Sequence, residues 1–172
     1  MISKKIAEAL NKQLNNEMFS AYLYLSMSAY SEHIGLKGFA NWFYVQYQEE
    51  MVHAMKFYKY ILDQGEIVRL MQIDQPDQEF DSPLDMFEKT LEHERFITKC
   101  INELVDIAIQ EKDYATHTFL QWFITEQVEE EASVGEILDQ LKLVQNSGNG
   151  LFMIDKELGQ RTFNATELAG DN

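Results

Sequence analysis

Four long stretches with apolar side chains every three or four positions dominate this sequence, and this period predicts an α-helix for each. In the first stretch Ile6, Leu10, Leu14 and Ala21 fall on one face. Only two prolines occur in the 172 residues, so little in the chain interrupts a helix. We expect helices at about 3–33, 38–64, 83–110 and 114–145.

Residues with turn and capping chemistry mark the ends of these helices. Gly35 and Gly65 follow the first two stretches, where glycine commonly ends a helix. Asp81-Ser82-Pro83 combines capping side chains with a proline in the first turn, which predicts the start of the third helix. Residues 147–150 (SGNG) break the chain after the fourth, and a short fifth helix is expected at about 151–161.

The lengths of the connections predict how the helices pack. Short turns near positions 35 and 112 make antiparallel neighbours of the first two helices and of the last two. Residues 66–81 are long enough to cross a bundle from end to end. The expected fold is all-α, a four-helix bundle with one long crossover loop and a short C-terminal fifth helix. We expect a single domain over residues 1–163 and a flexible tail at 164–172.

Each long helix places a carboxylate where its apolar stripe predicts a hydrophobic residue. These positions are Glu17, Glu50, Glu94 and Glu130, and His53 lies one turn after Glu50. Glu17 and Glu50 lie at similar distances from the first turn, as do Glu94 and Glu130 from the second. In antiparallel pairs equal distances from the turn mean equal heights, so all four acids should converge in the middle of the bundle.

Four buried carboxylates need compensation, because taking even one ion out of water costs several kcal/mol. Taken singly, a buried glutamate is more often salt-bridged, a buried histidine is more often a hydrogen-bonded core residue, and Glu129-Glu130-Glu131 is more often a solvated face. Together on four helices they favour bound cations. Glu50-x-x-His53 is typical of di-iron and di-manganese bundles, and carboxylates with one imidazole suit iron or manganese.

Composition excludes several classes of partner. The formal net charge of −15 argues against nucleic acid and favours a cationic substrate. No apolar run approaches the roughly 20 residues of a membrane span, and the N-terminus has no signal-peptide core. Cys100 is the only cysteine, which fits a reducing compartment. We therefore expect a cytoplasmic protein that binds neither nucleic acid nor membrane.

Several stretches resemble the non-haem ferritins of bacteria and archaea, and the resemblance runs from about Lys4 to Arg161. They are 16–25 (NEMFSAYLYL), 48–54 (QEEMVHA), 119–123 (FLQWF) and 126–131 (EQVEEE). The resemblance implies iron storage: a ferroxidase that oxidises Fe(II) with dioxygen or hydrogen peroxide and deposits a ferric oxyhydroxide mineral. It also implies a hollow homo-oligomeric shell of twenty-four subunits and no haem.

The same resemblance implies the iron ligands. Glu17, Glu50 and His53 would hold the first iron, and Glu50 would bridge to a second iron held by Glu94 and Glu130. Gln127 would be a hydrogen-bonding neighbour of this pair. A possible third iron site would be formed by acids beside the pair: Glu49, Glu126, Glu129 and Glu130.

Two further residues have competing interpretations. Tyr24 lies two turns from Glu17 on the same face, where it could donate an electron, hydrogen-bond a ligand or simply pack in the core. By the resemblance, His117 corresponds to a pore on the threefold axes of the shell, where the acidic residues of animal ferritins are missing. A histidine ring there could pass Fe(II), or His117 could be an ordinary surface or interface residue.

Three related classes are alternatives. A haem-containing bacterioferritin would carry its haem-ligating methionine at the position of Met51, directly after Glu50. That family also has a second Glu-x-x-His, but here Ser133 stands three residues after Glu130. A DNA-protecting mini-ferritin would hold its iron between subunits, whereas this chain carries a complete set of ligands. The third is a non-storage di-iron oxidase such as a rubrerythrin. Rubrerythrins add a cysteine-rich iron site that one cysteine cannot supply.

Overall fold

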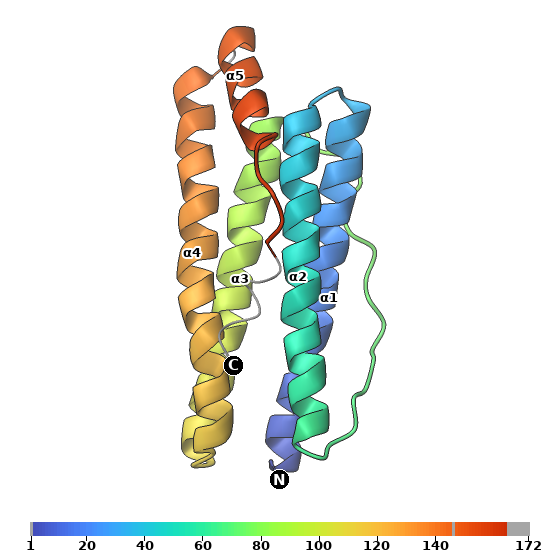
Figure 1. Cartoon of the computed structure of the whole chain (residues 1–172), viewed down its shortest axis with the longest axis vertical. Coiled ribbons are helices and arrows are strands. Elements are labelled where there is room, and N and C mark those ends of the chain that lie inside the picture. Colours follow the sequence, from blue (N-terminus) through green and yellow to red (C-terminus); the bar gives the residue numbers. More distant parts are fainter. Residues whose placement is uncertain (1, 146, 165–172) are drawn as a thin grey trace.

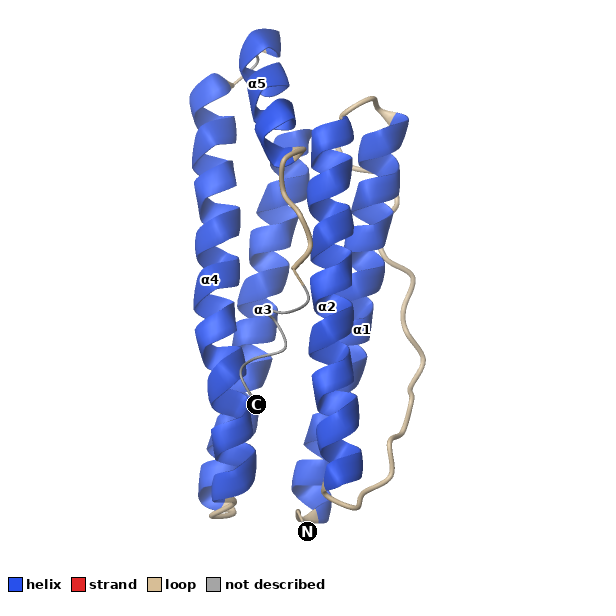
Figure 2. Cartoon of the chain, viewed as in Figure 1, coloured by secondary structure: helices blue, strands red, loops and turns tan. Residues whose placement is uncertain are grey.

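The computed structural model describes residues 2–145 and 147–164, and within these ranges every regular element is an α-helix (Figure 2). The helices are α1 (Lys4–His33), α2 (Lys37–Asp63), α3 (Pro83–Gln110), α4 (Tyr114–Val144) and α5 (Gly148–Leu158). The all-α four-helix bundle with one crossover and a short fifth helix is thus confirmed. The predicted tail at 164–172 lies outside the described residues, apart from Asn164.

Local chemistry explains most of these helix ends. Ser3, Ser82 and Asp113 each accept a hydrogen bond from a backbone N–H in the first turn of α1, α3 and α4. Gly35 and Gly65 follow α1 and α2 with positive φ angles of 84° and 76°, which a glycine adopts without strain. The predicted ends of the four long helices agree with the structure to within one or two residues.

The crossover after α2 runs along the outside of α1 and makes α2 and α3 point in the same direction (Figure 1). Side chains of α1 donate hydrogen bonds to the backbone of the crossover near both of its ends. Near its start, Asn11 Nδ2 donates to Ile67 O at 3.3 Å. Near its end, Tyr30 OH donates to Phe80 O at 2.7 Å. The connection is therefore fixed to the bundle by hydrogen bonds to loop carbonyls.

Helix α5 begins three residues earlier than the sequence predicted. Glycines 148 and 150 were expected to break the chain, yet they form the first turn of α5, where the capping serine 147 accepts from Gly150 N at 3.2 Å. Gly150 also lies against Val144, since a Cβ there would come within 2.6 Å of the Val144 side chain. The helix correspondingly ends at Leu158, so Arg161 lies in the extended segment beyond it, not in a helix.

The interior is two apolar clusters with a polar layer between them. One cluster, toward α5, contains Phe43 and Phe87, and the other, toward the opposite end, contains Phe57 and Phe123. The layer consists of buried polar side chains from all four long helices, among them Glu17, Ser20, Gln46, Glu50, His53, Glu94, Gln127 and Glu130. No described helix is both long enough and apolar enough to span a membrane.

Candidate metal centre

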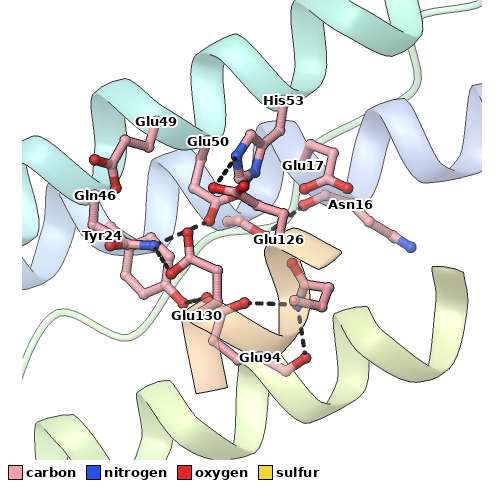
Figure 3. Close-up of polar contacts among 12 residues, drawn as sticks. Asn16, Glu17, Tyr24, Gln46, Glu49, Glu50, His53, Glu94, Glu126 and Glu130 are labelled. Atoms are coloured by element: carbon pink, nitrogen blue, oxygen red, sulfur yellow. Dashed lines mark hydrogen bonds and ion pairs between the residues drawn. The ribbon is translucent and has the colours of Figure 1, made fainter. Parts of the chain in front are cut away.

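The polar layer brings together the five groups that interrupt the predicted apolar stripes. Glu17, Glu50, His53, Glu94 and Glu130 are each no more than 5% exposed. Figure 3 shows their side chains pointing toward one another from four helices. They reach equal height because α1 pairs with α2 and α3 with α4 as antiparallel neighbours. The expected convergence of the acids is therefore observed.

Glu17, Glu50 and His53 form a set with metal-ligand spacing. One ligand atom from each lies within 4.8 Å of the others. His53 Nδ1 is 3.4 Å from Glu50 Oε2, and Gln13 Nε2 donates to Glu17 Oε1 at 2.8 Å. The other carboxylate oxygen of Glu17 is buried without a hydrogen-bond partner, and so is His53 Nε2. Buried polar atoms are rarely left unpaired, so these two atoms are suited to bind a cation.

His53 also belongs to a second set, with Glu126 and Glu130. His53 Nε2 is 3.7 Å from Glu126 Oε1, which is too long for a hydrogen bond. The Glu126 side chain is 19% exposed, unlike the fully enclosed acids of the layer. The imidazole therefore separates an enclosed set of ligands from one that reaches toward the surface.

Glu94 belongs to neither of these sets and is held by hydrogen bonds. Tyr24 OH donates to Glu94 Oε1, and Gln127 Nε2 donates to Glu94 Oε2 at 3.1 Å. Tyr24 is completely buried. The structure thus places Tyr24 and Gln127 on a carboxylate of the layer, and a metal bound by Glu94 would have to share its oxygens with these donors.

Two contacts of the layer were not predicted from the sequence. Gln46 Nε2 donates to Glu130 Oε2 at 2.6 Å, and Gln46 Oε1 accepts from Arg161 Nη1 at 2.8 Å. Gln46 lies one turn before Glu50 on the same stripe, and that spacing was the available signal. Arg161 gave no such signal, because its place depends on how α5 docks.

A pocket of about 340 Å³ opens beside the layer, between α2 and α4. Its lining includes the remaining predicted acids, Glu49, Glu126 and Glu129, together with Glu130 and Arg161. We call it the outer pocket, and we call the layer of Glu17, Glu50, His53, Glu94 and Glu130 the inner cluster. Glu129 is exposed, whereas Glu49 is half-buried and accepts a hydrogen bond from Arg161 Nη2.

Burial dominates the electrostatics of the inner cluster. It raises the pKa of Glu17, Glu50 and Glu94, and it raises that of Glu130 to about 8. The charge of Glu94 adds to the increase at Glu50 and Glu130. Without metal, the acids of the inner cluster therefore retain protons that exposed acids lose. A divalent cation would displace those protons.

His53 and Tyr24 respond to the same negative surroundings. Burial alone would lower the pKa of His53, but the charges of Glu50 and Glu17 and the nearby carboxylate of Glu126 raise it well above its usual value. Burial, followed by the charges of Glu94 and Glu50, raises the pKa of Tyr24 well above its usual value. Tyr24 is thus a neutral hydrogen-bond donor at pH 7.

Comparison with known proteins agrees with this geometry. The family model described as a ferritin-like domain matches residues 7–144. The chain belongs to the ferritin family. It is 46% identical over 156 residues to a bacterial non-heme ferritin of Campylobacter jejuni, covering 91% of this chain and 93% of that protein. It is 47% identical over 161 residues to one from Bacteroides fragilis, covering 94% and 100%.

Solved ferritin structures share this fold over nearly the whole chain. A closed form of the Archaeoglobus fulgidus ferritin, engineered by mutagenesis, has a TM-score of 0.94 and 52% identity over 95% of this chain and all of that one. The open-pore ferritin of the same archaeon gives 0.93 and 52% identity over 94% and 98%. Family membership and the four-helix architecture are thus established by sequence and by structure.

The remaining residue of interest in this ferritin, His117, lies far along α4 from the inner cluster. Its side chain is half-buried, and His117 Nε2 lies 3.3 Å from Gln121 Nε2. Nothing in a single chain places it on a symmetry axis, so its role in iron entry stays a prediction.

Proposed function

We propose that this chain is a ferroxidase that oxidises Fe(II) at a di-iron centre within each subunit and stores the product as a ferric oxyhydroxide mineral. The observation that carries the proposal is the inner cluster itself. Four buried carboxylates and one histidine face one another, and two of their buried ligand atoms have no hydrogen-bond partner. The names of the bacterial relatives support non-haem iron and iron storage.

The ligand assignment follows the geometry where it can. Glu17, Glu50 and His53 have the spacing to hold the first iron. For the second iron we propose Glu50 as the bridge, with Glu94 and Glu130 as terminal ligands, each supported by one amide donor. Gln127 donates to Glu94 at 3.1 Å and Gln46 donates to Glu130 at 2.6 Å. These amide groups orient the two carboxylates, and they can still donate their hydrogen bonds after the carboxyl groups lose their protons.

The reaction needs a pair of irons because the oxidant takes electrons in pairs. Each Fe(II) loses one electron, and two electrons with two protons convert dioxygen to hydrogen peroxide, or hydrogen peroxide to two waters. Carboxylate oxygens bind Fe(III) more strongly than Fe(II), because harder cations prefer hard anionic ligands. The cluster therefore favours the oxidised product, and hydrolysis of that product to oxyhydroxide releases further protons.

The other predicted residues have supporting roles in this proposal. Tyr24 donates a hydrogen bond to Glu94 and is completely buried, so it orients that proposed ligand. Glu49, Glu126, Glu129 and Glu130 form a third, weaker iron site in the outer pocket. Its partial exposure makes it the weaker one, because solvent and salt screen its charges.

We further propose a hollow homo-oligomeric shell of twenty-four subunits in the cytoplasm. The open-pore and closed forms described for the Archaeoglobus ferritin support an assembly around a cavity. The acidic chain, with a formal charge of −15, suits a container for cations.

The test is iron oxidation by the purified protein. Fe(II) is added without oxygen in small steps, air is admitted, and absorbance follows the appearance of Fe(III). The proposal predicts a fast phase proportional to protein up to about two or three irons per chain, followed by slower growth of a mineral inside an assembled shell. Oxidation no faster than in buffer, or strong haem absorbance in the purified protein, would overturn it.

A further inference from the structure

The extended segment after α5 carries one positive side chain into the acidic outer pocket. Arg161 lies in the segment that descends between α4 and α2 in Figure 1. Among the described residues that line the outer pocket, it is the one with a positive charge, against Glu49, Glu126, Glu129 and Glu130. Its side chain is 25% exposed, so most of it is removed from water.

A continuous face of α2 positions this segment. Asp155 of α5 accepts hydrogen bonds from Gly38 N at 2.8 Å and from Phe39 N at 3.1 Å. Both donors lie in the first turn of α2, where backbone N–H groups lack partners within the helix. Gly38 is required there, because a Cβ would lie 1.5 Å from Asp155 O. One turn on, Asn41 Nδ2 donates to Arg161 O at 2.9 Å. The backbone of Arg161 is thus fixed before its side chain enters the pocket.

The guanidinium then contacts three side chains that follow one another, about one turn apart, along that face of α2. It lies over the Trp42 ring, with Cζ 4.6 Å from the ring centre. Its Nη1 donates to Gln46 Oε1 at 2.8 Å, and its Nη2 donates to the Glu49 carboxylate. The same Gln46 donates to Glu130, so a chain of hydrogen bonds connects the pocket with the inner cluster. A planar guanidinium suits such a set of acceptors better than an ammonium does.

We propose that Arg161 is a positioning residue that acts as the built-in cation of the outer pocket, holding Glu49 and Gln46 and competing with iron for Glu49. This inference rests on the proposed function, because it concerns the weaker iron site of that reaction. Iron entering the pocket must take the Glu49 carboxylate from Arg161 and meet the repulsion of its charge. The inner acids instead face His53, which is itself a proposed iron ligand and does not have to be displaced. The two inner positions therefore fill first, and the outer one fills after them.

The experiment is an anaerobic calorimetric titration with Fe(II) of the assembled parent protein, Arg161→Gln, Arg161→Lys and Arg95→Gln. Arg95 pairs with the exposed side of Glu131 and lies outside the pocket, so its variant makes the same change in net charge. For Arg161→Gln we expect the weaker step to tighten roughly tenfold, because the competing charge is gone. The number of tight irons should stay at two, because none of their proposed ligands is removed. Arg161→Lys should fall near the parent, and Arg95→Gln should match it.

A purely structural Arg161 predicts the opposite sign, since loosening Glu49 would weaken the outer site. An outer step that is unchanged or weaker in Arg161→Gln, with both tight irons intact, overturns the inference alone. Absence of tight binding in the parent overturns the proposed function and this inference with it. Asn41→Ala gives a second route if Arg161→Gln does not assemble, because it releases the Arg161 backbone without altering any charge. It should tighten the outer step by a smaller factor, and an unchanged step there counts against the inference.

Discussion

The inner cluster and the outer pocket are neighbours that share Glu130, yet they balance their charge differently. The inner cluster is at most 5% exposed, and its acids have raised pKa values because burial disfavours their charge. The outer pocket is partly open and contains Arg161. Protons compensate the first in the absence of metal, whereas a side chain compensates the second. Within the proposed function, burial prepares the inner cluster for tight metal binding, and a fixed cation weakens binding in the outer pocket.

The largest effect should come from breaking the inner cluster. Glu50→Ala and His53→Ala should each slow the fast oxidation of Fe(II) by roughly 100-fold or more, because each removes a proposed iron ligand. The helical circular dichroism should not change. Stopped-flow absorbance after addition of air measures the rate. Initial rates equal to the parent in both variants would remove the di-iron assignment.

A second test uses the pH dependence of stability without metal. Because the folded-state pKa of Glu130 is about 8, well above its ordinary value of 4.5, the native protein binds a proton that the unfolded chain has lost at intermediate pH. Stability conferred by the neutral acid is therefore full at low pH and falls as pH rises toward about 8. Thermal melts of the metal-free protein should show the melting temperature falling between pH 5 and 8.

Glu130→Gln is the matched variant for this test, since it keeps the shape of the side chain and removes its titration. Its melting temperature should depend less on pH than that of the parent, by several degrees over the range. Parallel curves for the two proteins would show that Glu130 is already ionised in the native state, and the proton-compensated picture of the inner cluster would then be wrong.

Changes to the outer pocket should have smaller consequences. Glu129→Ala should lower the iron bound per chain and change the oxygen consumed per iron, while the initial rate of oxidation changes at most a few-fold. The reason is that Glu129 is exposed and lies outside the inner cluster. An oxygen electrode and an anaerobic iron titration measure both quantities. Identical titrations for variant and parent would make this acid part of a solvated face.

The smallest effect is expected for His117, which is remote from both regions. His117→Ala should slow iron uptake by the shell at most a few-fold, because the negative charge of the chain can draw Fe(II) through other openings. Uptake is measured as mineral absorbance after repeated additions of Fe(II). A variant shell as slow as one made of Glu50→Ala subunits would make His117 part of the main entrance.

The same comparison shows how far sequence reasoning reached. The acids of the inner cluster were predictable because each interrupts a helical stripe, and helix lengths then set their heights. Gln46 lies on such a stripe as well, but it gave no metal signal because an amide has no charge to compensate. Arg161 was assigned to a helix, and its contact with Glu49 could not be predicted because it depends on the docking of Asp155 against the start of α2.

The fold itself followed from local signals except at the C-terminal end. Periodicity and capping residues predicted the long helices to within one or two residues, because each helix carries its own pattern. The start of α5 was misplaced because its first-turn glycines are tolerated by a serine cap and by packing on Val144. The ligand roles of the site residues stay predictions, since they concern iron rather than the protein alone.

Counting the protons that iron displaces tests directly whether the inner cluster is a proton-compensated metal site. Anaerobic Fe(II) titrations by calorimetry, in two buffers of different ionisation enthalpy, give the irons bound tightly and the protons released with them. We expect two tight irons per chain that together release at least one proton near pH 7, because burial raises the pKa of Glu130 to about 8 without metal. The weaker outer step should release fewer, since Arg161 already balances that pocket. Tight binding without proton release, or proton release only in the weaker step, would contradict the account.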